Sequence, residues 1–452
     1  MAIESLGVGS NLNLSSLLDG LEKSEKTKLQ PITAKLSSTN AKLSAFGQLQ
    51  NSLESFQTAA QKLNDSKLYQ GFATQVSGSA LTAKADSTAA AGSYDIQVNS
   101  LATAESRATA GRADTDSIVG TGQLTINLGS KSTDIDITDG SLSGIRDAIN
   151  KADAGVTASI INDGSGTPYR LVLNSQTTGA ASTMSFDSTN SDLKSLFSGA
   201  ETTVTAQDAS ITVNGLAITS STNTVKEAIQ GVTLDLAETT AAGASTKLTV
   251  NQDTDSVKTA VKDFVTAYNN LADKITSLTK PTGEGDSFRG AALTGNSNVR
   301  SVQSTLRNIM SSAVDGGGMN YLFEAGVSFS KDLTKSGKLE ITDEAKLDKA
   351  LSSNLDGMKG LFSGDGTNGI ASRLDSSIKQ MLSDNGVVGS AQTGLKSSVE
   401  SLKDRSAKMQ DSISTTMERY KKQFQQLDSL MSQLNNTQSY LAQQLDALNK
   451  AS

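Results

Sequence analysis

Cysteine, histidine and tryptophan are absent from this sequence, and proline occurs only three times. Without thiols or imidazoles the chain has no disulfide bonds, no cysteine or histidine nucleophile, and none of the usual protein ligands of zinc and other transition metals. Catalysis would have to rest on carboxylates, lysine, serine or tyrosine, and we find no catalytic arrangement of these residues. We therefore expect a protein that is not an enzyme and that uses neither a metal ion nor another cofactor.

Large apolar side chains are also scarce, since 36% of the residues are hydrophobic and 4% are aromatic. Serine, threonine, alanine, asparagine and glutamine take their place. A chain of 452 residues with this composition predicts about three slender domains with thin cores. We expect the stability of each domain to depend on its neighbours.

Excess positive charge is missing as well. The formal net charge is -7 and the pI is near 5.0, with no basic tract above this background, so we expect no nucleic-acid binding. No apolar stretch approaches the roughly 20 residues of a membrane span, and the first twenty residues do not resemble a signal peptide, so we expect no membrane insertion. Composition alone is typical of a cytoplasmic protein. The lack of cysteine also suits a chain that is exported unfolded by a route without a removable signal.

Three glycines, Gly364, Gly366 and Gly369, match the G-x-G-x-x-G pattern that lets a backbone approach the pyrophosphate of a dinucleotide. That site requires a buried strand before the glycines. Residues 355–362 are instead predicted to be helical. We therefore do not assign nucleotide binding to this segment.

Two further patterns are weak. Asp134, Asp136 and Asp139 lie close together in the sequence, but a calcium loop would have glycine where Asp139 stands, and no glutamate occupies its twelfth position. Ser191 and Lys194 form an S-x-x-K pair without the companion motifs of serine enzymes. We interpret both groups as solvated residues without a chemical role.

The carboxyl end carries the clearest pattern, a stripe whose members recur at alternating steps of three and four residues. This period predicts a helix of roughly 60 Å whose stripe pairs with another helix as in a coiled coil, while a packed helix of an ordinary bundle is the alternative. The stripe consists of Met409, Ile413, Thr416, Tyr420, Phe424, Leu427, Met431, Leu434, Gln438, Leu441, Leu445 and Leu448.

The amino end mirrors this arrangement. Asn11 or Asn13 is predicted to cap a first helix that carries Leu14, Leu18 and Leu21. Pro31 breaks or restarts it, and a second helix follows to about residue 63. Two terminal helical zones of this kind are expected to pack against each other or against copies of themselves.

Between about residues 70 and 254 the hydrophobic period changes from helical to two, with glycine and serine at the breaks, which predicts β-strands. Short helices are expected at Ser143–Lys151 and at Val225–Ile229. Helical spacing resumes at Val257 and continues toward the carboxyl end, with one predicted hairpin near residues 327–341.

These segments predict an α+β multidomain fold, in which terminal helices form a coiled-coil or helical-bundle leg and two small mainly-β domains are inserted between them. We place the leg at residues 1–40 and 412–452, and a helical-bundle domain with a β-hairpin at 41–70 and 255–411. One β domain is expected at 71–115 and 205–254, and the inserted β domain at 116–204.

Several stretches together resemble one family, the bacterial flagellar hook-associated protein 2, or filament cap, family. They are GVGSNLNLSSLLDGL at residues 7–21, the segment 140–179 that is similar to a repeat of flagellar axial proteins, ITVNGLAITSSTNTVKEAIQGVTLDL at 211–236, FVTAYNNL at 264–271, and GVSFSKDLTKSGKLEITDEAKLDKAL at 326–351. They occur in the family's order and span most of the chain. The resemblance is weakest at 101–142 and 184–210.

The resemblance implies a structural protein that is secreted through the flagellar type III pathway to the distal tip of the filament. There its copies would form a homo-oligomeric ring, a pentamer or a hexamer, that retains exported flagellin and promotes its folding and insertion, so that the protein is required for motility. The β domains would form the plate of this cap and the helices its legs. A flagellar export chaperone would bind the carboxyl-terminal helix before secretion.

We predict the leg seam, which contacts flagellin or the chaperone, to consist of Leu14, Leu18, Leu21, Leu427, Met431, Leu434, Leu441, Leu445 and Leu448. Two alternative functions remain open at this point. The first is another flagellar axial protein of the junction type. The second is a cap that also serves in cell adhesion by binding host mucin or another glycan.

Overall fold

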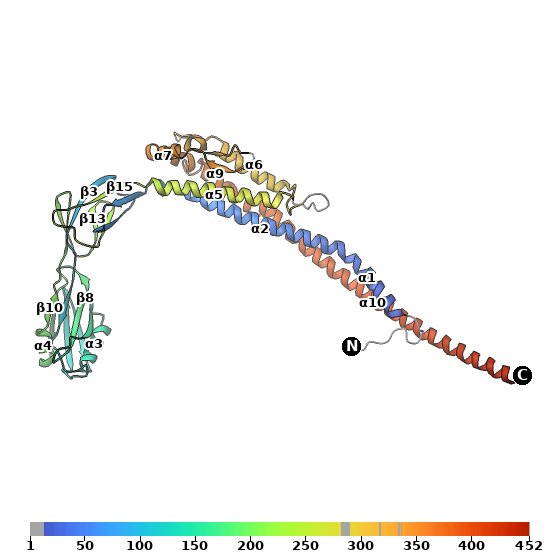
Figure 1. Ribbon diagram of the computed structural model, residues 1–452, viewed down its shortest axis with the longest axis horizontal. Helices are drawn as coiled ribbons and strands as arrows, with labels where there is room; N and C mark the ends of the chain where they lie inside the picture. The colour runs from blue at the N-terminus through green and yellow to red at the C-terminus, as the bar shows by residue number, and fades with distance from the viewer. Residues whose placement is uncertain (1–12, 282–289, 316–317, 333–334, 336, 452) are drawn as a thin grey trace. The chain divides into compact units, whose positions relative to one another are not determined.

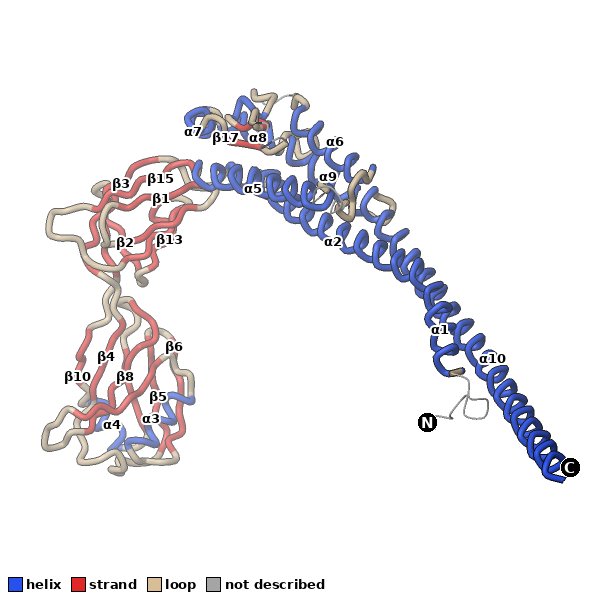
Figure 2. Tube along the Cα trace, turned by 45° about the vertical axis from the view of Figure 1, so that its right-hand side comes forward, coloured by secondary structure: helices blue, strands red, loops and turns tan. Residues whose placement is uncertain are grey.

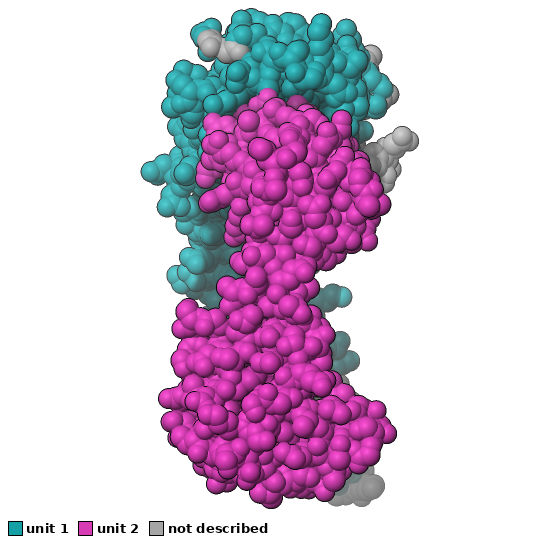
Figure 3. All heavy atoms as spheres, turned by 90° about the vertical axis from the view of Figure 1, so that its left-hand side faces the viewer, with its two compact units in different colours: residues 1–66, 255–452 teal, residues 67–254 magenta. Residues whose placement is uncertain are grey.

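A computed structural model describes residues 13–281, 290–315, 318–332, 335 and 337–451, without the side chains of 448–451. The chain divides into two compact units, residues 1–66 with 255–452 and residues 67–254 (Figure 3). The first unit is helical and the second is built from β-strands. The predicted fold class, terminal helices with two small mainly-β modules between them, is confirmed.

The helical unit contains long helices from both ends of the chain and shorter ones between them (Figures 1 and 2). The Asn13 side chain accepts a hydrogen bond from Ser16 N and caps the first helix, whereas the alternative cap, Asn11, lies outside the described residues. Pro31 lies in the first turn of the next long helix. The described helices are α1 (Leu14–Lys26), η1 (Thr27–Leu29), α2 (Gln30–Asn64), α5 (Thr254–Thr279), α6 (Ser297–Ser311), η4 (Leu322–Ala325), α7 (Glu344–Ser353), α8 (Leu355–Phe362), α9 (Ile370–Leu382) and α10 (Val387–Ala451).

The core of this unit is organised around a small group of aromatic rings. Phe56 of α2 lies with its ring centroid 5.2 Å from that of Phe264 and 5.5 Å from that of Tyr268, both on α5. Phe362 of α8 meets Phe264 edge-on, and Phe329 of the short hairpin β16–β17 (Val327–Phe329 and Leu339–Ile341) meets Tyr268. In a chain so poor in aromatic residues, this cluster joins four elements that are distant in the sequence.

The β unit contains two modules, each with its own hydrophobic core. The first has a five-stranded antiparallel sheet in the order β1-β15-β3-β11-β12 and a three-stranded sheet β13-β14-β2. Alternate side chains point inward, as in β14, where Val232, Leu234 and Leu236 are buried. The strands are β1 (Phe72–Val76), β2 (Leu81–Ala85), β3 (Gly92–Ser100), β11 (Ala209–Val213), β12 (Leu216–Ser220), β13 (Thr224–Ile229), β14 (Val232–Leu236) and β15 (Thr246–Gln252).

The helix expected at Val225–Ile229 is wrong, because this segment is strand β13. Its ladder with β14 shifts register between Lys226 and Ile229, and Glu227 has a φ of 63°. Val225 and Ile229 are both buried, because residues four apart lie on one face of a strand as they do on one face of a helix. The spacing of these two residues therefore does not distinguish a strand from a helix.

The second module is inserted between β3 and β11 of the first. It has the sheets β10-β4-β8-β7 and β6-β5-β9, and two helices that complete its core. The expected helix at Ser143–Lys151 is confirmed as α3, which Ser141 caps. The elements are β4 (Ala104–Ala108), β5 (Gly122–Leu128), β6 (Lys131–Ile137), α3 (Leu142–Lys151), β7 (Val156–Asn162), β8 (Tyr169–Thr178), β9 (Met184–Ser188), α4 (Ser191–Ser198) and β10 (Glu201–Val204).

Candidate functional site

The two ends of the described chain pack against each other as antiparallel helices. Gln392 near the start of α10 donates a hydrogen bond of 2.9 Å to Gln50 on α2, and α10 then runs past α1, as Figures 1 and 2 show. Residues 18–29 and residues 410–421 line one groove. Residue numbers therefore fall along α2 and α1 while they rise along α10, as in an antiparallel pair. The terminal helices thus pair within one chain along part of their length.

The groove between α1 and α10 has an apolar floor and a charged rim. It has a volume of about 380 Å³ and is lined by Leu18 and Leu29 on one side and Ile413 and Met417 on the other. Of the amino-terminal seam residues predicted above, Leu14 is only 4% exposed, whereas Leu18 and Leu21 are half-buried. Leu18 lines the groove with α10 residues without being fully covered.

The carboxyl-terminal part of α10 presents the opposite situation. Its last buried side chain among the described residues is that of Ile413. Beyond it, Leu427, Leu434, Leu441 and Leu445 keep between 39% and 61% of their surface exposed, and Met431 is half-buried. The side chain of Leu448 lies outside the described residues. We call Leu427, Met431, Leu434, Leu441 and Leu445 the exposed stripe.

Two further exposed side chains near this stripe were missed by the sequence analysis. Leu430 and Tyr440 are 55% and 60% exposed. Leu430 lies three residues after Leu427 and four before Leu434, so it also satisfies the spacing of the seam. The predicted stripe contains Met431 and not Leu430, although both residues fit its alternating steps of three and four.

The exposed stripe can bind another apolar helix or surface. Fully burying one leucine side chain contributes about 1.5–3 kcal/mol, so covering these half-exposed residues would contribute on the order of 1 kcal/mol each. The remaining residues of this segment are mostly serine, asparagine and glutamine, with Asp428 and Asp446 as its only charges between residues 423 and 449. Such a surface favours contacts that are modest individually and cumulative along the helix.

The motifs considered above for chemistry have structural explanations. Gly364 and Gly366 have φ angles of 61° and 92°, and a Cβ on Gly369 would lie 2.1 Å from the carbonyl oxygen of Phe362. The glycines therefore serve a tight connection between α8 and α9. Lys194 pairs with Asp187 at 2.9 Å, and Asp139 accepts a hydrogen bond from Ser141 N before α3.

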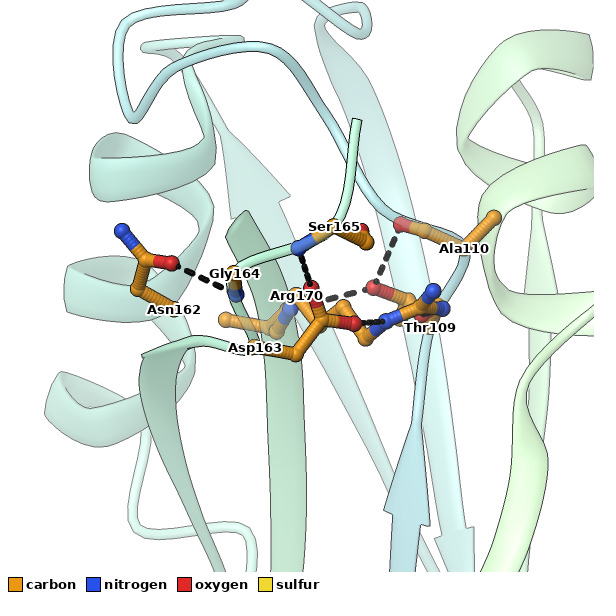
Figure 4. A network of polar contacts seen from close by, with 8 residues as sticks. Thr109, Ala110, Asn162, Asp163, Gly164, Ser165 and Arg170 are labelled. Atoms are coloured by element: carbon orange, nitrogen blue, oxygen red, sulfur yellow. Dashed lines mark hydrogen bonds and ion pairs between the residues drawn. The ribbon is translucent and has the colours of Figure 1, made fainter. Parts of the chain in front are cut away.

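A polar network orders the hairpin between β7 and β8, inside the segment that resembles a flagellar repeat (Figure 4). Asp163 accepts hydrogen bonds from Arg170 Nε at 2.5 Å and from Ser165 N at 2.9 Å, and Asn162 accepts one from Gly164 N. The hydrogen bonds from Arg170 and Ser165 lower the pKa of Asp163 to about 2. Arg170 also donates to Thr109 O, so the hairpin is joined to the chain that follows β4.

The described residues contain no cluster of three or more aspartate or glutamate side chains that could hold a metal ion. Among them there is also no helix with the length and apolar character needed to cross a bilayer.

Three family models match consecutive parts of the chain. The model of the flagellar hook-associated protein 2 C-terminus matches residues 206–436, and that of its N-terminus matches residues 10–105. The flagellin hook IN motif matches residues 123–177, within the inserted module. Together the matches cover both units.

Full-length relatives are similar throughout. The chain is 39% identical to flagellar hook-associated protein 2 of Escherichia coli strain K12, over 98% of each chain. It is 38% identical to the protein of the same name from Salmonella typhimurium strain LT2, over the whole of both chains. The crystal structure of the D1-D2-D3 domains of the E. coli flagellar cap protein FliD matches with a TM-score of 0.65 and 37% identity, and covers 78% of this chain and 99% of that one.

Proposed function

Because the chain belongs to the flagellar hook-associated protein 2 family, it is a cap protein of the bacterial flagellar filament, and we propose that the exposed stripe of α10 is its grip on the filament. The observation that carries this proposal is the row of leucines beyond Ile413 that keep 39% to 61% of their surface exposed. A helix with this surface is incomplete until another protein contacts it. Flagellin at the growing tip is the partner that we propose.

The chemistry of the stripe suits a grip that must be released. A cap has to step as each new subunit enters beneath it, and a contact that dissociates slowly would stop growth, since affinity differences appear mostly in the dissociation rate. Exposed leucines separated by glutamine, asparagine and serine bind without buried ion pairs. The contact can therefore be broken and formed again one helical turn at a time.

The β unit would serve as the plate of the cap. Each of its modules has its own hydrophobic core, so each can keep its shape while the helices adapt to the filament. We propose a homo-oligomeric ring of such chains that retains exported flagellin and promotes its folding and insertion. The predictions of a pentamer or a hexamer follow from the family resemblance alone.

Before export, the same stripe is proposed to bind the flagellar export chaperone, because an exposed apolar helix needs cover in the cell. Export through the flagellar type III pathway is compatible with a chain that has no disulfide bonds to reduce. The junction-type alternative receives no support, since the solved relative is named a cap protein. Binding of host mucin or another glycan stays a prediction from the resemblance.

The proposal is tested by placing charges in the exposed stripe. The double variant Leu434→Asp with Leu441→Asp introduces two carboxylates where flagellin is expected to bind. The matched control is Asn436→Asp with Gln443→Asp, which adds the same charges at the same seven-residue spacing on the opposite face of α10, where both side chains are exposed.

We expect the stripe variant to fold and be exported but to leave filaments short or absent, with flagellin monomers in the medium. Each aspartate loses the contact of one leucine and must be desolvated, about 2 kcal/mol or more per site. The control variant should swim normally. Filament length by electron microscopy and flagellin in the culture supernatant are the measurements, and equal motility of the two variants would reject the proposal.

A further inference from the structure

Asparagine side chains cover two strand edges in the described part of this protein. Asn150 of α3 donates to Ala158 O and accepts from Ala158 N, both at 2.8 Å, on the outer edge of β7. Asn269 of α5 makes the same pair of 2.8 Å bonds with Leu339 of β17. A side-chain amide thus replaces the neighbouring strand, and it prevents another chain from pairing there.

Other edges in the β unit are protected by different means. Strand β1 lies beside β2, where Thr74 Oγ1 donates to Ala83 O. Strands β10 and β13 have register shifts. Several outer strands carry charges that discourage pairing, namely Lys131, Asp134 and Asp136 of β6, Asp187 of β9, Glu201 of β10, and Lys226 and Glu227 of β13.

Strand β12 has none of these protections. It is the edge of the five-stranded sheet, its sequence from Leu216 to Ser220 contains no charge, no proline and no bulge, and Leu216 is 72% exposed. The strand is also held in place in advance. Asn214 and Gly215, with φ angles of 48° and 83°, form the two-residue turn that joins it to β11.

The register of this hairpin identifies which backbone groups are free. Val213 lies opposite Leu216 across the two-residue turn, so this pair and every second pair after it exchange hydrogen bonds. The N–H and C=O groups of Ala217 and Thr219 therefore point away from β11. Among the described residues, no further backbone hydrogen bond reaches either of them.

We propose that β12 is a docking edge for β12 of a second copy of this chain. In an antiparallel pairing centred on Ile218, Ala217 of one copy lies opposite Thr219 of the other, and each such pair exchanges two hydrogen bonds. This arrangement uses all the free backbone groups of Ala217 and Thr219. It extends the five-stranded sheet of one copy into that of its neighbour.

The sequence of β12 fits its own copy. Antiparallel self-pairing brings a strand against its own residues, so an edge with charges of one sign would repel itself, and β12 has no charge. Ile218 lies opposite Ile218 of the second copy, which places two β-branched side chains together. Leu216 lies diagonal to that same residue and gains cover for its exposed side chain.

The contact is isologous and closes after two copies. A ring of five or six copies needs a heterologous contact instead, so the β12 pairing adds to the ring contact and does not replace it. It requires nothing of the terminal helices. Its outcome is therefore independent of the proposed grip on flagellin.

Introduced cysteines give a direct test, because the natural chain contains none. Full-length Ala217→Cys and Thr219→Cys are purified separately, mixed in equal amounts and oxidised mildly, and the disulfide-linked dimer is measured on a non-reducing gel. In the proposed register the two mutated positions are directly opposite, about 5.5 Å apart between Cα atoms, within the range that a disulfide spans. In a dimer of one variant with itself, the two cysteines lie diagonally across the paired strands, about 7–8 Å apart.

We expect the mixture to form about fivefold more cross-linked dimer than either variant alone, since geometry favours the directly opposite pair. A second comparison checks the same register by charge. Ala217→Lys with Thr219→Glu should keep the dimer in sedimentation velocity, because unlike charges then face each other, whereas Ala217→Lys with Thr219→Lys should lose it. Residues 217 and 219 are both exposed, so both double variants should melt as the natural protein does.

Equal cross-linking in the mixture and in the single variants would mean random collision and would overturn the proposal. The proposal would also be overturned if the natural chain formed rings but no dimer at the same concentration. A third outcome would assign the β12 edge to flagellin. In that case either cysteine variant would cross-link to a cysteine placed in flagellin and would form no disulfide-linked dimer with itself or with the other variant.

Discussion

At the scale of single residues, Asp163 shows how an exposed carboxylate orders a loop. Its pKa is lowered to about 2, first by the hydrogen bond from Arg170 and then by those from Ser165. A carboxyl whose pKa is lowered in the folded state stabilises that state above its ordinary pKa near 3.8. The contribution is lost as the pH falls from about 4 to about 2.

The variant Arg170→Gln should raise the pKa of Asp163 toward its ordinary value, because the largest cause of the shift is removed. The measurement is a titration of the carboxyl carbon by NMR with ¹³C-labelled aspartate. Arg146→Gln is the control, since Arg146 pairs with Asp147 in the same module and not with Asp163. An unchanged midpoint in Arg170→Gln would show that the turn amides alone hold the carboxylate.

Residue roles could be predicted from the sequence where they depend on near neighbours. Asn13 was one of two predicted caps because a cap acts within its own turn. The roles of Asn150 and Asn269 could not be predicted, since each bonds to a strand that only the folded chain brings close. The exposed stripe was predicted from spacing alone, but its function in binding stays a proposal.

At the scale of elements, the cover of β7 by Asn150 makes a prediction of its own. Asn150→Asp keeps the shape of the side chain but cannot donate to Ala158 O, and at neutral pH its carboxylate would be placed against that carbonyl. We expect the β7 edge to lose about 1–3 kcal/mol of local stability. Hydrogen exchange of peptides that cover residues 156–162 measures this loss.

The control for this prediction is Asn162→Asp, which changes the same side chain at the other end of β7. Asn162 accepts from Gly164 N and donates no hydrogen bond found among the described residues, so an acid can replace it. Its exchange at Ala158 should match that of the natural chain. If Asn150→Asp were protected from exchange as well as the natural chain is, the role assigned to the Asn150 amide would be contradicted.

Helices with regular spacing were predicted well, and elements with irregular backbones were not. In β13 the four-residue spacing of Val225 and Ile229 suited a helix as well as a strand, and the helix predicted from it was wrong. Helix α10 begins at Val387, more than twenty residues before the predicted stripe at Met409. Its first part contains Gly389 and Gly394, which weaken helix propensity, and it is stabilised by packing on α2 and α9 that the sequence does not reveal.

At the scale of the whole molecule, α10 has one part that contributes to the core and a second, exposed part that we propose for binding. Residues up to Ile413 contribute to the core of the helical unit, while those from Leu427 onward bury little. Stability and capping should therefore respond differently when the chain is shortened. A protein that ends at Gln426 lacks the exposed stripe, and one that ends at Asp446 keeps it.

We expect the protein ending at Gln426 to melt within a few degrees of the full chain, because no described side chain beyond it is buried. It should nevertheless fail to cap, with flagellin lost to the medium. The protein ending at Asp446 should restore filament growth. If the shorter protein capped filaments normally, the grip would have to lie in the groove between α1 and α10 or in the β unit. If the shorter protein unfolded instead, the stripe would be part of the core in the assembled protein.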